Sequence, residues 1–135
     1  MIAVDTSVLV DLFRGAETPH TVALERFERD GFPIAVPAVC CQELLQGARD
    51  KREWRKLERN LSTQQLLVPE DPWECHLEAA RIFFDARQKG ITLRGTVDCL
   101  IAQLALEHDC ALLHDDRDFD LIAEVRPLRV VPAGE

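Results

Sequence analysis

The sequence has no apolar run that approaches the roughly 20 residues needed to cross a lipid bilayer. The opening stretch MIAVDTSVLVDLF carries no basic segment ahead of its apolar residues, and Asp5 and Asp11 interrupt it. A secretory signal needs such a basic segment and an uninterrupted apolar one, so this stretch disfavours export. We therefore expect a cytoplasmic protein without a membrane span.

The chain also lacks any CxxC motif. It has five cysteines, an odd number, and two of them, Cys40 and Cys41, are adjacent. This pattern disfavours a disulfide framework and a zinc ribbon. We expect buried free thiols, as in proteins of a reducing cytosol.

An excess of positive charge is missing as well, because the formal net charge is −8. An acidic chain does not attract a phosphate backbone by its overall field, so a nucleic-acid partner requires a local basic patch or bound cations. The stretch KREWRKLER (51–59) is one such patch. A solvated helix, with Glu53 and Glu58 as ion-pair partners, explains the same stretch equally well.

The 135 residues show no internal repeat, low-complexity tract or linker, and we predict a single domain, 1–135. Short β-branched runs alternate with amphipathic stretches, which indicates an α/β fold with a parallel sheet covered by helices. Asp71 and Thr96 are the expected N-caps of two of the helices. The expected strands are 2–5, 32–37, 65–69, 111–114 and 128–131, of which 65–69 is alternatively an extended connector. The expected helices are 7–15, 17–31, 38–50, 51–61, 71–90, 96–110 and 117–124, with a bend near residue 50.

Acidic residues stand where two predicted strands end. IAV runs into Asp5, and ALLH runs into Asp115 and Asp116. In open parallel α/β sheets the carboxyl ends of the strands form the ligand-binding edge, so these acids can meet there. Asp98 lies in the first turn of a predicted helix, a position that favours a carboxylate and commonly faces the same edge.

Glu43 is unusual for a different reason. Its helix has a polar face made of Gln42, Gln46 and Arg49, and Glu43 lies off that face among small and apolar residues. An ion pair with an arginine is the simpler alternative to a functional role.

Carboxylates that gather at one edge repel one another, and shared protons, a basic side chain or a divalent cation must offset that repulsion. A ligand set made of oxygen atoms alone suits Mg²⁺ or Mn²⁺, and no HxxxH motif or cysteine cluster favours zinc. Each acid taken singly also fits a helix cap or a solvated turn, so spacing alone leaves both interpretations open.

Four segments in this order resemble the PIN-domain family, and within it the VapC toxins of bacterial toxin–antitoxin pairs. They are IAVDTSVLVDLF, PAVCCQELLQGA, GITLRGTVDCLIAQLALEH and LLHDDRDFDLIAE. The resemblance covers essentially the whole chain. It implies a three-layer α/β/α fold with a central, mainly parallel sheet of four to five short strands.

The resemblance also implies the site. Its acidic quartet corresponds to Asp5, Glu43, Asp98 and Asp116 as catalytic residues, and Asp118 is a further acid that often joins the site in this subgroup. The expected metal ligands are Asp5, Asp98, Asp116 and Asp118, with Glu43 assisting the attacking water. Ser7 or Thr6 matches the hydroxyl residue beside the first Asp, and Asp115 is a reserve candidate for the role of Asp116.

The implied activity is that of a Mg²⁺-dependent endoribonuclease, with Mn²⁺ as a possible substitute, that cleaves transfer or ribosomal RNA and inhibits translation. Arg94 and Arg117 stand nearest the acids and are the candidates for contact with RNA phosphates. The alternative is a catalytically silent PIN-like module that binds RNA or protein. A phosphoacceptor receiver domain also clusters acids at strand ends, but neither late strand is followed by the lysine it requires.

The expected partners are a VapB-type antitoxin and a second copy of the chain, in a homodimer that becomes a heterotetramer or larger with antitoxin. Antitoxins of this kind lay an apolar segment into a groove. Apolar side chains available for such a contact are Phe13, Trp54, Trp73 and Phe84, although core packing is the expected role of each.

Overall fold

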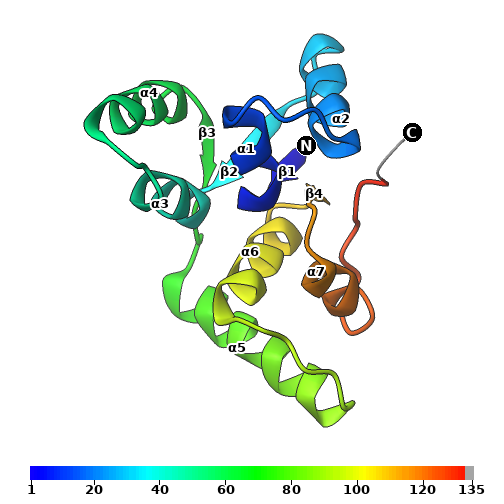
Figure 1. Ribbon diagram of the computed structural model, residues 1–135. Helices are drawn as coiled ribbons and strands as arrows, with labels where there is room; N and C mark the ends of the chain where they lie inside the picture. Colours follow the sequence, from blue (N-terminus) through cyan, green and yellow to red (C-terminus); the bar gives the residue numbers. More distant parts are fainter. Residues whose placement is uncertain (133–135) are drawn as a thin grey trace.

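A parallel sheet of four short strands lies at the centre of the protein, for which we have a computed structural model that describes residues 1–132 (Figure 1). The last three residues of the expected domain lie outside this range. The strands are β1 (Ile2–Val4), β2 (Ile34–Pro37), β3 (Gln65–Leu67) and β4 (Ala111–Leu113), in the spatial order β3-β2-β1-β4. All three strand pairings are parallel.

The helices form two groups. In one, α1 contacts α2 and α3, and α3 contacts α4; in the other, α6 contacts α5 and α7 (Figure 1). The α/β prediction, with a parallel sheet between helices, is confirmed. The helices are α1 (Thr6–Phe13), α2 (Pro19–Arg29), α3 (Ala38–Gln46), α4 (Lys51–Leu61), α5 (Pro72–Gln88), α6 (Thr96–Glu107) and α7 (Arg117–Ile122).

Strands β1 and β4 are almost completely buried, although β4 stands at the end of the strand order. Ala3, Val4, Leu112 and Leu113 have no measurable exposure, because helices cover both faces of a parallel sheet. Such strands read as continuous apolar runs rather than as alternating ones. This is why IAV and ALL were recognisable as strands from the sequence.

Helix starts follow local capping chemistry. Asp71 caps α5 by accepting from the backbone N–H of Glu74, as predicted. Asp50 caps α4 in the same way, so the expected bend is a complete break between α3 and α4. The prediction for Thr96 is wrong, since Gly95 is the N-cap of α6 and Thr96 is its first helical residue.

The expected final strand, 128–131, is also wrong. Only one isolated bridge forms there, between Val130 and Leu112. Pro127 and Pro132 flank this segment and have no N–H to donate, which prevents a longer ladder. The segment therefore contacts β4 without extending the sheet.

All five cysteines are free, and four of them are buried, as expected. Within residues 1–132 none of the helices combines the length and the apolar character needed to span a bilayer.

Candidate active site

The acids gather where the chain changes direction across the sheet. From β1 the chain moves to β2 and then β3, whereas β4 lies on the other side of β1. The carboxyl ends of β1 and β4 thus border a switch point, the place where open α/β sheets bind ligands. Asp5 directly follows β1, and Asp115 and Asp116 follow β4.

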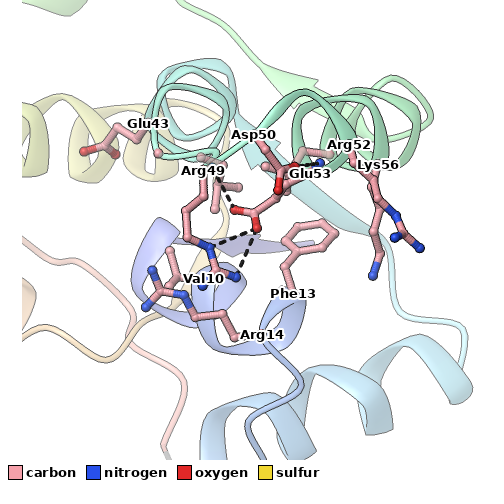
Figure 2. Close-up of a pocket in the computed structure, with 12 residues that line it drawn as sticks. Val10, Phe13, Arg14, Glu43, Arg49, Asp50, Arg52, Glu53 and Lys56 are labelled. Carbon is pink, nitrogen blue, oxygen red and sulfur yellow. Dashed lines mark hydrogen bonds and ion pairs between the residues drawn. The ribbon is translucent and has the colours of Figure 1, made fainter.

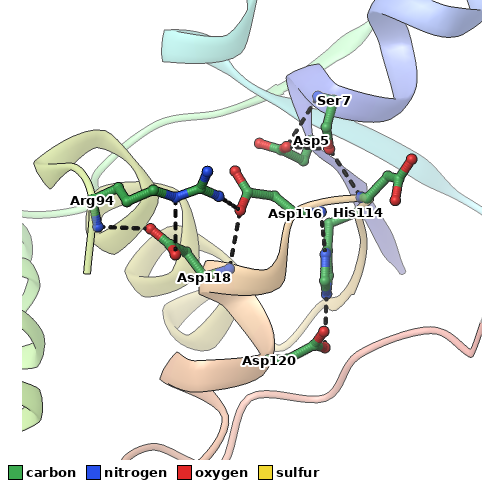
Figure 3. A network of polar contacts seen from close by, with 8 residues as sticks. Asp5, Ser7, Arg94, His114, Asp116, Asp118 and Asp120 are labelled. Carbon is green, nitrogen blue, oxygen red and sulfur yellow. Dashed lines mark hydrogen bonds and ion pairs between the residues drawn. The ribbon is translucent and has the colours of Figure 1, made fainter. Parts of the chain in front are cut away.

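Asp5 is buried, with 4% of its surface exposed, and it caps α1. One of its carboxylate oxygens accepts from the backbone N–H of Ser7 at 3.0 Å and from the Ser7 hydroxyl at 2.6 Å (Figure 3). The Ser7 hydroxyl in turn accepts from the backbone N–H of Asp115 at 2.9 Å. Ser7 therefore orients Asp5 and ties the ends of β1 and β4 together.

Glu43 is held by the other candidate hydroxyl residue. Its Oε1 accepts a hydrogen bond from the Thr6 hydroxyl at 2.8 Å, although the two residues lie on different helices, α3 and α1. Glu43 is half-buried. The sequence left Ser7 and Thr6 as alternatives, and the structure gives each a carboxylate of its own.

Three aspartates lie closest together. Asp98 in the first turn of α6, Asp116 at the N-cap of α7 and Asp118 within α7 each offer one oxygen, and these oxygens lie within 4.8 Å of one another. We call these residues the aspartate trio. Asp118 is 1% exposed. Asp5 and Glu43 lie outside the trio.

Asp5 and Glu43 are nevertheless close enough to the aspartate trio for their charges to affect the pKa of Asp98. Burial raises the pKa of Asp98 to about 7, and the negative charges of Asp116, Asp5, Asp118 and Glu43 add to this increase. All five carboxylates thus share one electrostatic site. A carboxyl group whose pKa is raised by burial and by neighbouring carboxylates is typical of a functional site.

Asp115 and Asp116 point in different directions. The Asp115 side chain is 53% exposed and lies 3.8 Å from Nδ1 of His20, away from the trio. Asp116 is 27% exposed and its Oδ1 accepts from the backbone N–H of Asp118 at 3.0 Å. The geometry favours Asp116 over Asp115 as the acid after β4 that belongs to the site.

Arg94 supplies positive charge. Its guanidinium donates to Oδ1 of Asp116 at 2.7 Å and to Oδ1 of Asp118 at 3.4 Å, and its backbone N–H donates to Oδ2 of Asp118 at 2.8 Å (Figure 3). Arg117 is exposed and forms no polar side-chain contact within the described part of the chain. The sequence named both arginines, but nothing in it signalled these ion pairs.

His114 has a local role. Its Nδ1 accepts from the backbone N–H of Asp116 at 3.0 Å, and its Nε2 lies 3.3 Å from Oδ1 of Asp120. Burial lowers the pKa of this imidazole, against the opposing effect of the Asp120 charge. The ring therefore supports the turn that presents Asp116.

Cys40 is a further neighbour of Asp5 that was not predicted from the sequence. The buried thiol of Cys40 lies 3.9 Å from Oδ1 of Asp5, and burial strongly raises the pKa of this thiol, so it stays neutral. The available signal was its position, one helical turn before Glu43 on α3. Its contact adds a weak donor to the oxygen of Asp5 that Ser7 does not bind.

A groove of about 650 Å³ lies between α1, α3 and α4 and reaches the acidic site at Glu43 (Figure 2). Of the four aromatic side chains named above, Phe13 lines this groove, whereas Trp54, Trp73 and Phe84 are exposed rather than in the core, contrary to expectation. The apolar lining residues are Val10, Phe13, Leu44 and Leu57, the cationic ones are Arg14, Arg49, Arg52 and Lys56, and the acidic ones are Glu43, Asp50 and Glu53.

Comparison with known proteins agrees with these features. A family model described as PIN domain matches residues 2–125. The chain is 35% identical over 130 residues to Ribonuclease VapC11 of Mycobacterium tuberculosis, covering 96% of each protein. It is also 35% identical to Ribonuclease VapC51 of the same organism, over 96% of this chain and 93% of that one.

Solved structures with the same fold include VapBC2 from Rickettsia felis bound to a promoter DNA fragment, with a TM-score of 0.75 and 20% identity over 97% of this chain and 98% of that one. DNA-bound VapBC from Salmonella typhimurium has a TM-score of 0.77 and 19% identity over 96% of each chain. At this identity the likeness concerns the fold.

Proposed function

Because the chain belongs to the PIN domain family, we propose that it is a Mg²⁺- or Mn²⁺-dependent endoribonuclease, the toxin of a toxin–antitoxin pair. The observation that carries the proposal is the aspartate trio, with Asp5 and Glu43 beside it at the switch point of the sheet. The curated relatives bear the name ribonuclease. We propose transfer or ribosomal RNA in the cytoplasm as the substrate, so that cleavage inhibits translation.

The donor set fits a hard divalent cation. Asp98, Asp116 and Asp118 offer oxygen ligands alone, and the raised pKa of Asp98 indicates negative charge that a cation neutralises. We assign Asp98 and Asp116 as its principal ligands, with Asp118 and Asp5 in support. When bound, such a cation activates water and stabilises negative charge on phosphoryl oxygens.

Other residues of the chain accept the proton of the attacking water and bind the phosphates. Glu43, oriented by the Thr6 hydroxyl, accepts the proton of the attacking water. Asp5, oriented by Ser7, faces the same space from the end of β1. Arg94 and Arg117 are the groups that contact the phosphates of the RNA on either side of the scissile bond.

The test is incubation of purified, antitoxin-free protein with total RNA, with and without Mg²⁺ or Mn²⁺, beside an Asp98→Asn variant. We expect defined fragments that require metal and vanish in the variant, and mapping their ends identifies the substrate. The matched control is Asp109→Asn, since Asp109 is a solvent-exposed acid at a left-handed turn position that Asn also tolerates. Folded protein that cleaves none of the structured RNAs contradicts the proposal and favours a silent binding module.

We place the VapB-type antitoxin in the groove between α1, α3 and α4. The solved structures that share this fold include VapBC complexes. The groove has an apolar lining and four cationic side chains, and it ends beside Glu43. This chemistry suits a segment with apolar anchors flanked by acidic residues, which covers the approach to the site.

For the expected homodimer we propose the outer face of α5. Trp73, Leu77 and Phe84 are 71%, 43% and 46% exposed, and the exposed Ala80 lies between them. Their spacing of four, three and four residues places all four on one narrow stripe of the helix. We call these residues the α5 stripe.

The charges along α5 support a second copy as the occupant of the stripe. Glu70 and Glu74 lie just before and in its first turn, whereas Arg81, Arg87 and one acid, Asp85, which pairs with Arg81 and Arg126, lie in its C-terminal half. In an antiparallel pair of α5 helices each acidic end faces the basic half of the other copy. The large side chains Trp73 and Phe84 then meet across the pair, around the small Ala80.

A further inference from the structure

Arg94 forms three hydrogen bonds with the carboxylates of Asp116 and Asp118, and a role in RNA binding alone does not require them. We propose that Arg94 is an internal cation of the site, which neutralises Asp116 when no metal is bound and gives up this carboxylate when a divalent cation enters. Asp118 stays attached throughout and keeps the released guanidinium beside the cleft. The inference deepens the proposed function and rests on it for the identity of the cation.

The attachment to Asp118 has the features of a permanent anchor. Both carboxylate oxygens of Asp118 bind Arg94, one through the backbone N–H at 2.8 Å and one through Nε at 3.4 Å. The Asp118 side chain is 2% exposed. Two hydrogen bonds to one buried carboxylate hold Arg94 more firmly than the single bond to Asp116 does, so Asp118 retains this contact.

The contact between Arg94 and Asp116, in contrast, is exposed to solvent and easily broken. It uses the far end of the side chain, where Nη2 donates to Oδ1 of Asp116 at 2.7 Å. The Asp116 side chain is 27% exposed and that of Arg94 is 69% exposed, so water reaches both partners. An ion pair that is open to solvent contributes little net free energy and exchanges readily.

The two cations compete for one carboxylate. Asp116 belongs to the trio whose oxygens lie within 4.8 Å of one another, and its Oδ1 already accepts from Arg94. A divalent ion held by the trio would lie within a few Å of the guanidinium, and the two positive charges repel at that range. Binding of the ion therefore favours an arrangement in which the guanidinium has left Asp116.

Once it has left Asp116, Arg94 is available to bind a phosphate. Its Nε and backbone N–H remain on Asp118, and its Nη atoms face solvent at the edge of the site. A guanidinium held in this way binds a phosphate with two parallel hydrogen bonds. One residue would thus serve as the counter-ion of the metal-free site and as the phosphate contact of the loaded one.

The first experiment measures Mn²⁺ binding without RNA, by calorimetry or electron paramagnetic resonance. Arg94→Gln removes the competing charge, and we expect Mn²⁺ to bind roughly five- to tenfold more tightly, the order for one charge a few Å away in a largely aqueous setting. Arg94→Lys keeps the positive charge, and its Mn²⁺ affinity should stay within about twofold of the wild type. The matched control is Arg129→Gln, with no change expected. Arg129 pairs with Asp109, which follows the C-terminal end of α6, whereas Asp98 lies in the first turn of that helix. Unchanged or weaker binding in a folded Arg94→Gln protein overturns the proposal.

A second measurement uses the wild-type protein and does not depend on the folding of a variant. The arginine side-chain NMR signals of Arg94 are followed during a Mg²⁺ titration. We expect the Nη protons to lose protection from exchange while the Nε proton stays protected on Asp118. Signals that do not change at saturating Mg²⁺ contradict the exchange.

The outcomes separate the two proposals. Tighter Mn²⁺ binding by Arg94→Gln, without RNA cleavage by the wild type, supports the cation exchange and contradicts the ribonuclease. Metal-dependent cleavage with no effect of Arg94→Gln on Mn²⁺ binding does the reverse. If no variant binds Mn²⁺, both proposals fail.

Discussion

The hydroxyl of Ser7 accepts a hydrogen bond from the backbone N–H of Asp115, a residue 108 positions later in the chain. The same hydroxyl donates to Asp5 at 2.6 Å. One small side chain therefore bridges the ends of β1 and β4 and sets the position of an acid on one side and of a turn on the other.

The first prediction concerns this bridge. Ser7→Ala removes both hydrogen bonds of the hydroxyl and should lower the free energy of unfolding by about 1–2 kcal/mol, with reduced RNA cleavage. Urea denaturation monitored by circular dichroism measures the change. Ser62→Ala is the control, because the Ser62 hydroxyl forms a single exposed bond to the carbonyl of Arg59. Equal effects of the two substitutions would refute a special role for Ser7.

The second prediction follows from the pKa of Asp98, which is raised from 3.8 to about 7. Between these values the folded protein holds a proton that the unfolded chain releases, so ionisation of Asp98 lowers stability as pH rises from about 4 to about 7. Without metal, Asp98→Asn should be more stable than the wild type by about 2 kcal/mol at pH 8, after discounting for partial exposure. The two proteins should converge near pH 4. A variant that is less stable at pH 8 would indicate a structural role for the carboxylate.

The third prediction concerns added metal. Mg²⁺ binds only the folded site, so at one hundred times its dissociation constant it should stabilise the wild type by about 2.7 kcal/mol. Differential scanning calorimetry at pH 7.5 should show a rise in melting temperature for the wild type and a much smaller one for Asp98→Asn. The same rise in both proteins would place the metal elsewhere.

The fourth prediction tests the α5 stripe. Trp73→Asp puts a charge at its most exposed aromatic position and should shift the protein from dimer to monomer in analytical ultracentrifugation. Trp54→Asp is the matched control, since Trp54 is 44% exposed on α4, away from the stripe. A wild type that is monomeric at every concentration tested, or a loss of dimer with Trp54→Asp alone, contradicts the assignment.

The fifth prediction tests the groove. Arg52→Glu reverses one of its cationic side chains and should weaken binding of the cognate antitoxin about tenfold, chiefly by slowing association. Surface plasmon resonance with the purified antitoxin measures both rates. Arg59→Glu, on the same helix but not among the lining residues, should bind as the wild type does. Equal losses would point to a general charge effect.

Much of the fold follows from local patterns in the sequence. The buried strands β1 and β4 are apolar throughout, and Asp71 with Pro72 marks the start of α5. The errors lie where two local signals compete or where proline intervenes. Gly95, rather than Thr96, is the N-cap of α6. Between Pro127 and Pro132 only an isolated bridge forms in place of the expected last strand.

The candidate site was less accessible to prediction. Strand ends placed Asp5 and Asp116 at one edge, because parallel topology requires it. The split of Ser7 and Thr6 between two carboxylates, and the anchoring of Arg94 by Asp118, depend on side-chain directions after folding. No spacing in the sequence encodes these contacts.

The order of the strands has a consequence for synthesis. Asp5 and Glu43 emerge early from the ribosome, but Asp116 and Asp118 follow β4, the last strand to be made and the one that docks beside the first. Proteins fold from the N-terminus as they are made, so a nascent chain lacks the assembled acidic site for nearly all of its synthesis. A chain released before residue 116 therefore lacks two of the three carboxylates of the aspartate trio.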